Sequence, residues 1–137
     1  MKNILIDADV VLDFFLDRKP FSDDSNQILQ LCESKTVNGF ITPVIISNIY
    51  YILRKIASDR EIRIQLKNLL SLVSILEINK SILLKALDSH FKDFEDAIQN
   101  FSAEGSSEIE MIVTRNTKDF KKSNLSILTP AEFLKLI

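Results

Sequence analysis

Short apolar runs alternate with longer segments of helical periodicity along the chain. The short runs, each four to six residues long, predict buried strands of a mostly parallel sheet. The longer segments repeat apolar residues at spacings of three and four, which is typical of helices that bury one face. The expected strands are residues 2–6, 38–41, 73–78, 111–114 and 125–128. The expected helices are residues 10–16, 23–34, 43–57, 59–72 and 81–89, with two more beginning after Asp93 and Thr129.

Strands that alternate with helices predict one fold class. Parallel strands need helical crossovers, so the pattern favours an α/β three-layer α/β/α sandwich around a mostly parallel central sheet of about five strands. No repeat, linker or low-complexity stretch interrupts the pattern, and residues 1–137 are therefore predicted to form one domain. Ligands of such sheets bind beyond the carboxyl ends of the strands. That edge is where chemistry is expected.

Composition narrows the class of protein further. The 137 residues are 46% hydrophobic and 26% charged, which indicates a soluble globular chain, and the net charge of −2 argues against coating nucleic acid by bulk charge. The single cysteine, Cys32, excludes a disulfide framework and is predicted to be a buried structural thiol. No leader-like segment opens the chain and no apolar run approaches the roughly 20 residues of a membrane span, so a cytoplasmic protein is expected.

Polar side chains follow two of the expected strands. The first strand ends in Asp7-Ala8-Asp9, and one of these two acids is expected to cap the next helix. For Asp7 alone, a functional role and a capping role are equally compatible with the sequence. Asp13 is expected on a solvated helix face. The fourth strand is followed by Thr114, Asn116 and Asp119.

A third group of acids opens the helix after Asp93. Acids in a first turn complement the helix dipole by about 0.3–1 kcal/mol each, which explains one or two of them. Basic residues meanwhile surround the end of the fourth strand, at Arg115, Lys118 and Lys121. An acidic centre with a basic rim is what a metal-dependent nuclease needs, because a divalent metal neutralises carboxylates and basic side chains hold phosphates. Two glycines and one histidine exclude a phosphate-cradling glycine loop and disfavour a nucleophile triad.

These three segments together resemble the motifs of PIN-domain proteins. The resemblance covers Leu5–Asp13, Asp93–Ala97 and Ile112–Phe120 in the order and spacing of that family. It implies a compact nuclease fold that binds Mg²⁺ or Mn²⁺ and cleaves RNA. Many bacterial members are ribonuclease toxins of toxin–antitoxin pairs, so an antitoxin partner and a homodimer are expected. Carried over by position, the catalytic and metal-binding acids would be Asp7, Asp96 and Asp119, with Asn116 as a further metal contact.

One position departs from the family pattern. Where the family usually carries Glu, near the start of the helix after the second strand, this chain has Asn48. An amide oxygen can still ligate a metal, but it brings no charge. Asp9 is a candidate to restore a charge nearby. Asp9, Asn48, Asp93 and Thr114 are therefore expected to be accessory to the site, and Arg115, Lys118 and Lys121 to form an RNA-contacting rim.

Two other functions remain open at this stage. The loss of the Glu is compatible with a weakened or inactive PIN-like module that binds RNA or protein. The Asp7-x-Asp9 spacing also fits a phosphatase of the haloacid dehalogenase type, in which Asp7 would be the nucleophile and Asp9 the general acid. Against the phosphatase, the chain is short for that fold with a cap. Converging carboxylates would favour a metal site, and splayed ones the inert module.

Overall fold

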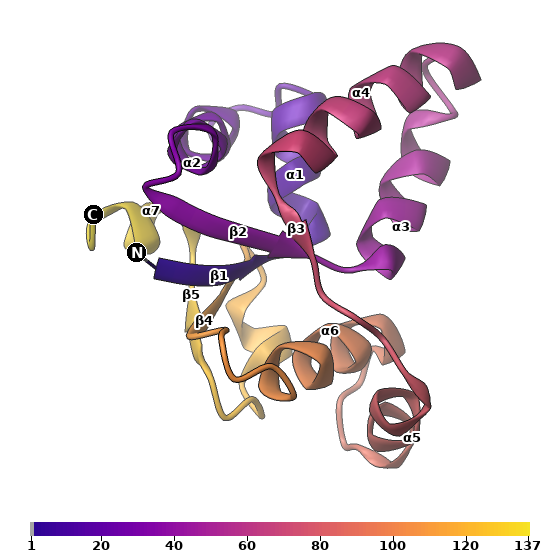
Figure 1. The fold of residues 1–137 in the computed structure, drawn as a ribbon, viewed down its shortest axis with the longest axis vertical. Coiled ribbons are helices and arrows are strands. Elements are labelled where there is room, and N and C mark those ends of the chain that lie inside the picture. Colours follow the sequence, from indigo (N-terminus) through magenta and orange to yellow (C-terminus); the bar gives the residue numbers. More distant parts are fainter. Residues whose placement is uncertain (1) are drawn as a thin grey trace.

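The central element is a five-stranded sheet in which every pairing is parallel (Figure 1). The computed structural model describes residues 2–137. The strands are β1 (Lys2–Ile6), β2 (Val37–Ile41), β3 (Ser74–Ile75), β4 (Met111–Val113) and β5 (Ser126–Leu128), in the spatial order β3-β2-β1-β4-β5. β1 is central, and it aligns Ile4 with Gly39 of β2 and with Met111 of β4.

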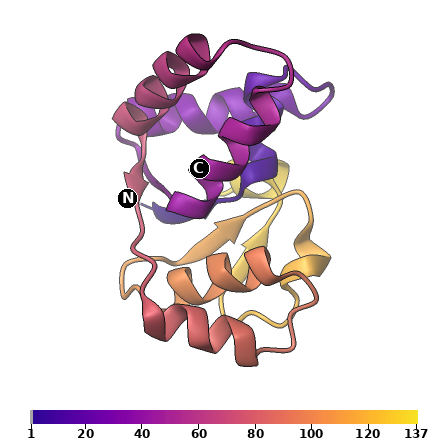
Figure 2. The same cartoon turned by 90° about the vertical axis from the view of Figure 1, so that its right-hand side faces the viewer.

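Helices cover both faces of this sheet. They are α1 (Ala8–Phe15), α2 (Ser22–Glu33), α3 (Pro43–Leu53), α4 (Asp59–Leu72), α5 (Lys80–Asp88), α6 (Phe94–Glu104) and α7 (Pro130–Leu134), with a short 3₁₀ helix, η1 (Thr117–Phe120). α1 to α4 lie on one face and α5 and α6 on the other, in both perpendicular views (Figures 1 and 2). The predicted α/β/α architecture is confirmed. No helix within residues 2–137 has the length and hydropathy to cross a membrane.

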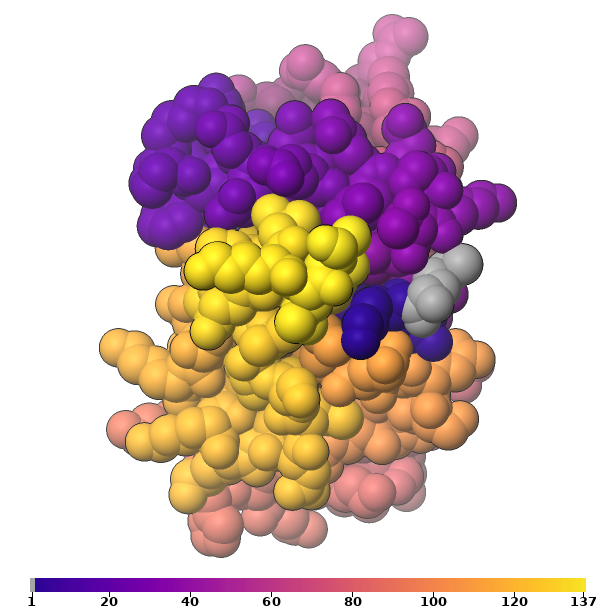
Figure 3. Space-filling view, turned by 90° about the vertical axis from the view of Figure 1, so that its left-hand side faces the viewer, coloured from indigo at the N-terminus to yellow at the C-terminus, as the bar shows by residue number. Residues whose placement is uncertain are grey.

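The core explains why β1 is the centre of the fold. Ile4, Leu5 and Ile6 have no exposed surface, as expected of a strand covered on both faces. Helix α2 packs close to the neighbouring strand, because a Cβ on Gly39 would lie 2.7 Å from Cys32 Sγ. Cys32 is the buried free thiol that the sequence predicted, and burial raises its pKa to about 11. The C-terminal helix α7 packs beside α2 on the side shown in Figure 3.

Two elements, α3 and β3, differ most from the predicted bounds, and several others differ by one or two residues at an end. Helix α3 ends at Leu53 instead of residue 57, because Ser58 starts the next helix by accepting a hydrogen bond from Glu61 N. Strand β3 has two residues instead of six. It is an edge strand, and the chain turns away after Leu76 N donates to Ile41 O.

Candidate active site

The carboxyl end of β1 delivers Asp7 to the junction with α1. Asp7 is the N-cap of α1, and its Oδ1 accepts a hydrogen bond from Ala8 N at 2.8 Å. Its Oδ2 accepts from the buried hydroxyl of Thr114, also at 2.8 Å. The capping role and the position at the site therefore fall on the same residue. Both oxygens of this carboxylate are held by donors from the protein.

The loop after β4 surrounds Asp9 with donors. Asp9 Oδ2 accepts from the backbone N–H of Arg115 at 3.1 Å and from the side-chain amide of Asn116 at 3.3 Å. Asn116 N donates in turn to Thr114 Oγ1 at 3.1 Å. Thr114 and Asn116, both expected at the site, thus hold Asp7 and Asp9 in place from the neighbouring strand. This contact follows from the sheet order, which sets β4 beside β1.

Asp96 enters the same region from the other face of the sheet. It lies in the first turn of α6, whose N-cap is Asp93, and Asp96 N donates to Asp93 Oδ1 at 3.0 Å. Burial, together with the charges of Asp7, Asp93, Asp119 and Asp9, raises the pKa of Asp96 to about 7. These charge effects indicate that the four other carboxylates lie near it. Asp93 is the helix cap that the sequence predicted.

Asp7 and Asp9 are perturbed in the same direction. Burial and, to a smaller extent, the charges of Asp9 and Asp119 raise the pKa of Asp7, the hydrogen bonds from Thr114 and Ala8 lower it, and the net result is a pKa of about 6. Burial also raises the pKa of Asp9, against the opposing backbone N–H and charge of Arg115. Arg115 thus compensates the charge of Asp9 in part, whereas the charges that act most strongly on Asp7 and Asp96 are those of other carboxylates. The site is therefore a region of unbalanced negative charge.

The donor set fits a hard divalent cation. Asp9 Oδ1 is buried without a hydrogen-bond partner, and carboxylate oxygens are the ligands that Mg²⁺ and Mn²⁺ prefer. Within residues 2–137 no three His, Cys, Asp or Glu side chains form a ready-made metal cage. Mg²⁺ does not require one, since it usually keeps several waters and binds through one or two carboxylates together with substrate phosphates. Asp7, Asp96 and Asp119 are the side chains suited to hold it.

Asp13 and Arg115 do not behave as the sequence predicted. Asp13 was expected on a solvated face, but its side chain is fully buried in α1. It accepts hydrogen bonds from Arg115 Nε at 2.5 Å and Nη2 at 3.0 Å, and Arg18 Nε forms an ion pair with it at 2.8 Å. The Arg115 guanidinium also stacks over the Phe21 ring, 4.1 Å from its centroid. The rim position expected for Arg115 is thus corrected: its charge is turned inward, where it compensates Asp13.

Lysines line a hollow beside two of the acids. The hollow has a volume of about 530 Å³, and its lining includes Asp93, Asp96 and Asp119. Lys118 and Lys121, both expected at the rim, line it and are exposed. Other basic residues of its lining, which the sequence analysis did not assign to the site, are His90, Lys92 and Lys122. His90 and Lys92 come from the loop between α5 and α6, so only the fold brings them to the end of β4.

Asn48 contacts an acid that the sequence analysis left without a role. Its side-chain amide donates to Glu95 Oε2 at 2.6 Å. Glu95 precedes Asp96 in the first turn of α6, and both Asn48 and Glu95 are solvent-accessible. The run of acids in residues 93–96 was visible in the sequence, but its contact with α3 was not. The bond joins the two helical layers at the carboxyl edge of the sheet.

A parallel α/β/α sandwich with carboxylates gathered at the carboxyl edge of its sheet defines the class of this protein. The family model of the PIN domain matches residues 3–118, and the chain belongs to that family. The resemblance of the three acidic segments is thereby confirmed. A curated relative, Ribonuclease VapC1 of Aquifex aeolicus (strain VF5), is 26% identical over 137 aligned residues, covering 96% of this chain and 93% of the relative.

Solved structures share the fold. One is VapBC2 from Rickettsia felis bound to a DNA fragment from their promoter, which matches with a TM-score of 0.65 and 15% identity over 92% of this chain and 96% of that chain. Another is FitAcB from Neisseria gonorrhoeae, with a TM-score of 0.64 and 14% identity over 93% of this chain and 98% of that chain. At these identities the likeness is one of fold.

Proposed function

We propose that this PIN-domain protein is a Mg²⁺- or Mn²⁺-dependent endoribonuclease, and that it acts in the cytoplasm as the toxin of a toxin–antitoxin pair. One observation carries the nuclease proposal. Asp7, Asp96 and Asp119 come from three separate elements, and their charges raise the pKa values of Asp7 and Asp96. The similarity to Ribonuclease VapC1 supports RNA as the substrate.

The roles of the residues follow from their contacts. Asp7, Asp96 and Asp119 would hold the ion, and Thr114 fixes the orientation of Asp7 by donating to its Oδ2. Asn116 is a further metal contact in this proposal, although its amide nitrogen donates to Asp9. A divalent ion bound there supplies Lewis-acid activation of water and of the phosphodiester.

The lysine hollow supports a polyanionic substrate. Lys118 and Lys121 line it next to Asp96 and Asp119, so a phosphate held by these lysines would lie beside the acids. Single-stranded RNA carries one phosphate per nucleotide, and lysines contribute to its binding mainly through charge. Because the chain as a whole has a net charge of −2, its overall charge does not attract RNA, and the attraction has to come from this local group of lysines. It lets a weakly acidic protein bind RNA at one place.

An apolar hollow on the other side of the fold supports a protein partner. It lies among α1, α3 and α4, has a volume of about 410 Å³, and includes Phe14 and Ile56 in its lining. Ile56, in the turn that follows α3, is 70% exposed, and Phe14, near the end of α1, is 38% exposed. Contiguous exposed apolar surface of this kind is typical of interaction sites. We propose that an antitoxin or a second copy of this chain covers it, which size-exclusion chromatography with light scattering tests.

Calorimetry with Mn²⁺ and Mg²⁺, combined with RNA cleavage on the same samples, tests the nuclease proposal. The wild type is expected to bind the ions and to cleave RNA, and Asp7→Asn to lose both. Asp23→Asn on α2 is the matched control, since Asp23 is an exposed acid that pairs with Lys19. Absence of binding at millimolar ion together with absence of cleavage would leave the inactive PIN-like binding module as the function.

A further inference from the structure

We infer that Asp13 and Arg115 form a clamp that positions the acids at the start of α1, and that Asp13 is thereby a positioning residue of the proposed metal centre, an inference that rests on the proposed function. The pair joins α1 to the loop after β4, and its members lie 102 residues apart in the sequence. The Asp13 side chain has no exposed surface, and that of Arg115 is 24% exposed. A buried ion pair fixes the two elements that it joins, because breaking it leaves an uncompensated charge in the interior.

Arg115 is attached to one face of α1 at two points. Its backbone N–H donates to Asp9 Oδ2 at 3.1 Å. Its guanidinium donates to both oxygens of Asp13, from Nε at 2.5 Å and from Nη2 at 3.0 Å. Asp9 and Asp13 are four residues apart, so they lie on the same face of the helix. A single hydrogen bond would let the loop turn about it, whereas two attachments of one residue fix both its place and its orientation.

The clamped loop contains donors that hold the acids. Thr114 Oγ1 donates to Asp7 Oδ2 at 2.8 Å, and the side-chain amide of Asn116 donates to Asp9 Oδ2 at 3.3 Å. Arg115 is the residue between these two donors, just after the end of β4. Holding Arg115 in place therefore holds the donors on either side of it. Asn116 also precedes η1, so the point at which that helix starts depends on the same clamp.

Arg18 and Arg115 both pair with Asp13, but they belong to different parts of the chain. Arg18 Nε lies 2.8 Å from Asp13 Oδ1 and comes from the segment between α1 and α2. Arg115 comes from the loop that carries the donors to Asp7 and Asp9. Loss of either arginine leaves Asp13 with one cationic partner, so a variant of either is expected to fold. The two arginines therefore allow a matched comparison, in which the same anion loses one partner and only one of the two variants releases the loop.

Charge and position predict opposite effects of Arg115 on metal binding. The guanidinium lowers the pKa of Asp9 by its charge, so the charge alone opposes a cation beside that carboxylate. If charge were the whole effect, removing the guanidinium would tighten Mn²⁺ binding. A clamp predicts weaker binding instead, because Asp7 and Asp9 lose their fixed orientation.

Arg115→Met and Arg18→Met test the clamp, since each removes one cationic partner of Asp13 and keeps an unbranched apolar side chain. Backbone amide exchange is measured by NMR on the metal-free proteins in EDTA, and Mn²⁺ affinity is measured by calorimetry. In Arg115→Met we expect the N–H groups of positions 115 and 116 to exchange about tenfold faster relative to those of Ile112 and Val113, because the loop loses its side-chain attachment. Mn²⁺ binding is expected to weaken about tenfold, the usual scale for a residue that orients a metal ligand. Arg18→Met is expected to leave both measurements unchanged.

A third variant and the possible outcomes complete the test. Asp13→Asn removes the anion of the clamp, and it is expected to change exchange and Mn²⁺ affinity in the same direction as Arg115→Met. Equal exchange at positions 115 and 116 in the two arginine variants, or Mn²⁺ binding that is unchanged or tighter in Arg115→Met, would show that the pair only contributes to packing, and the inference would be wrong. A wild type that binds no Mn²⁺ overturns the proposed function, whereas the exchange rates in EDTA decide separately whether the clamp holds the loop.

Discussion

Replacing Asp7 with Asn is expected to stabilise the metal-free protein in a way that depends on pH. Asn caps a helix as well as Asp does and keeps the shape of the side chain, so the substitution removes mainly the charge. Burial raises the pKa of Asp7 from 3.8 to about 6 in the folded protein. The folded state therefore holds this proton more tightly than the unfolded chain. The stability that the protonated acid provides is complete below about pH 4 and is lost as the pH rises through about 6.

The size of the effect follows from the shift. A change of about two pH units in pKa corresponds to about 3 kcal/mol at pH values above both pKa values, at 1.36 kcal/mol per unit. At about pH 5 roughly half of that penalty is already present, so the benefit of Asp7→Asn is expected to be about 1.5 kcal/mol larger at about pH 8 than at about pH 5.

Urea denaturation followed by circular dichroism, in EDTA at both pH values, measures this difference. Asp23→Asn, which removes an exposed acid, is expected to show no such dependence on pH. An Asp7→Asn variant whose change in unfolding free energy is equal at both pH values would refute the reasoning. The charge of Asp7 would then cost the folded protein nothing, and the site would not be an uncompensated acidic cluster.

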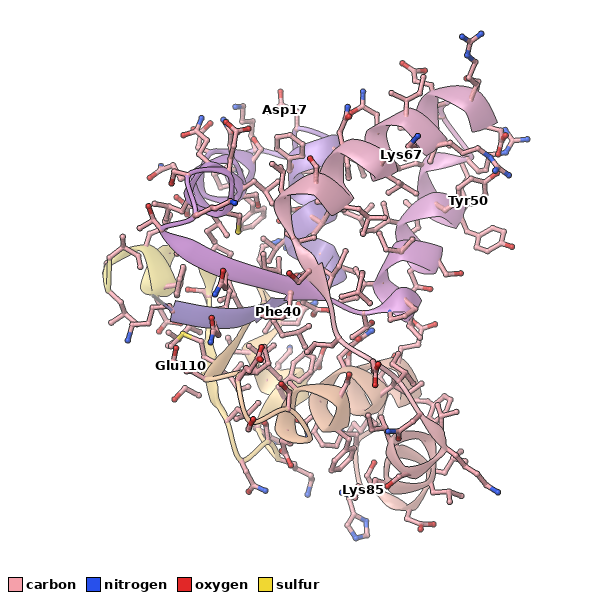
Figure 4. The ribbon with its side chains drawn as sticks, viewed as in Figure 1. Asp17, Phe40, Tyr50, Lys67, Lys85 and Glu110 are labelled. Atoms are coloured by element: carbon pink, nitrogen blue, oxygen red, sulfur yellow. The ribbon has the colours of Figure 1, made fainter. Side chains whose placement is uncertain are left out.

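Three further predictions address other parts of the molecule. Asp13→Asn is expected to lower the unfolding free energy by about 2–3 kcal/mol, because Arg115 loses its buried anion; a loss below about 0.5 kcal/mol in urea denaturation would contradict this. Lys118→Ala should reduce the slope of log affinity against log salt for single-stranded RNA in EDTA by about 0.7, whereas Lys67→Ala, on α4 in the opposite layer (Figure 4), should leave it unchanged. Gly39→Ala should cost about 1–3 kcal/mol through overpacking, and an unchanged melting temperature would argue otherwise.

The elements of the fold were predictable where local chemistry defines them. Helix α4 spans the predicted residues 59–72, and the helix predicted to begin after Thr129 is α7, which opens with a capping box of Thr129 and Glu132. Caps and periodicity act over three or four residues, so one stretch of sequence contains all that they need. The length of β3 was not predictable in this way. Its six apolar-rich residues fit a strand, but only the edge position in the sheet limits the pairing to Ser74–Ile75.

The site was predictable only as a set of residue types. Asp7 was visible in the sequence as a strand-end acid and Asp96 as one acid of a helix start, but the resemblance to the PIN-domain family is what selected them as site residues. The partners of Asp13 and Asn48 could not be predicted, since Arg115 lies 102 residues from Asp13 and Glu95 lies 47 residues from Asn48. Such contacts depend on which elements the topology makes neighbours. A basic residue beside acids can therefore be structural, as Arg115 is, while more distant lysines form the rim of the hollow.

The two hydrogen bonds to Asp7 have a consequence for the metal ion that the proposed function requires. Each carboxylate oxygen has two lone pairs, and Ala8 N and Thr114 Oγ1 already occupy one on each oxygen. One lone pair on each oxygen is left for a metal ion. Fixing a freely rotating side chain costs about 0.5–1.5 kcal/mol, and the Asp7 side chain is already held in place, so most of that cost is avoided when the ion binds. A pinned ligand of this kind favours small ions of strict octahedral geometry over larger ones, which bind best where ligands can adjust. If the proposed metal site exists, the fixed position of Asp7 would favour Mg²⁺ over Ca²⁺ before any RNA arrives.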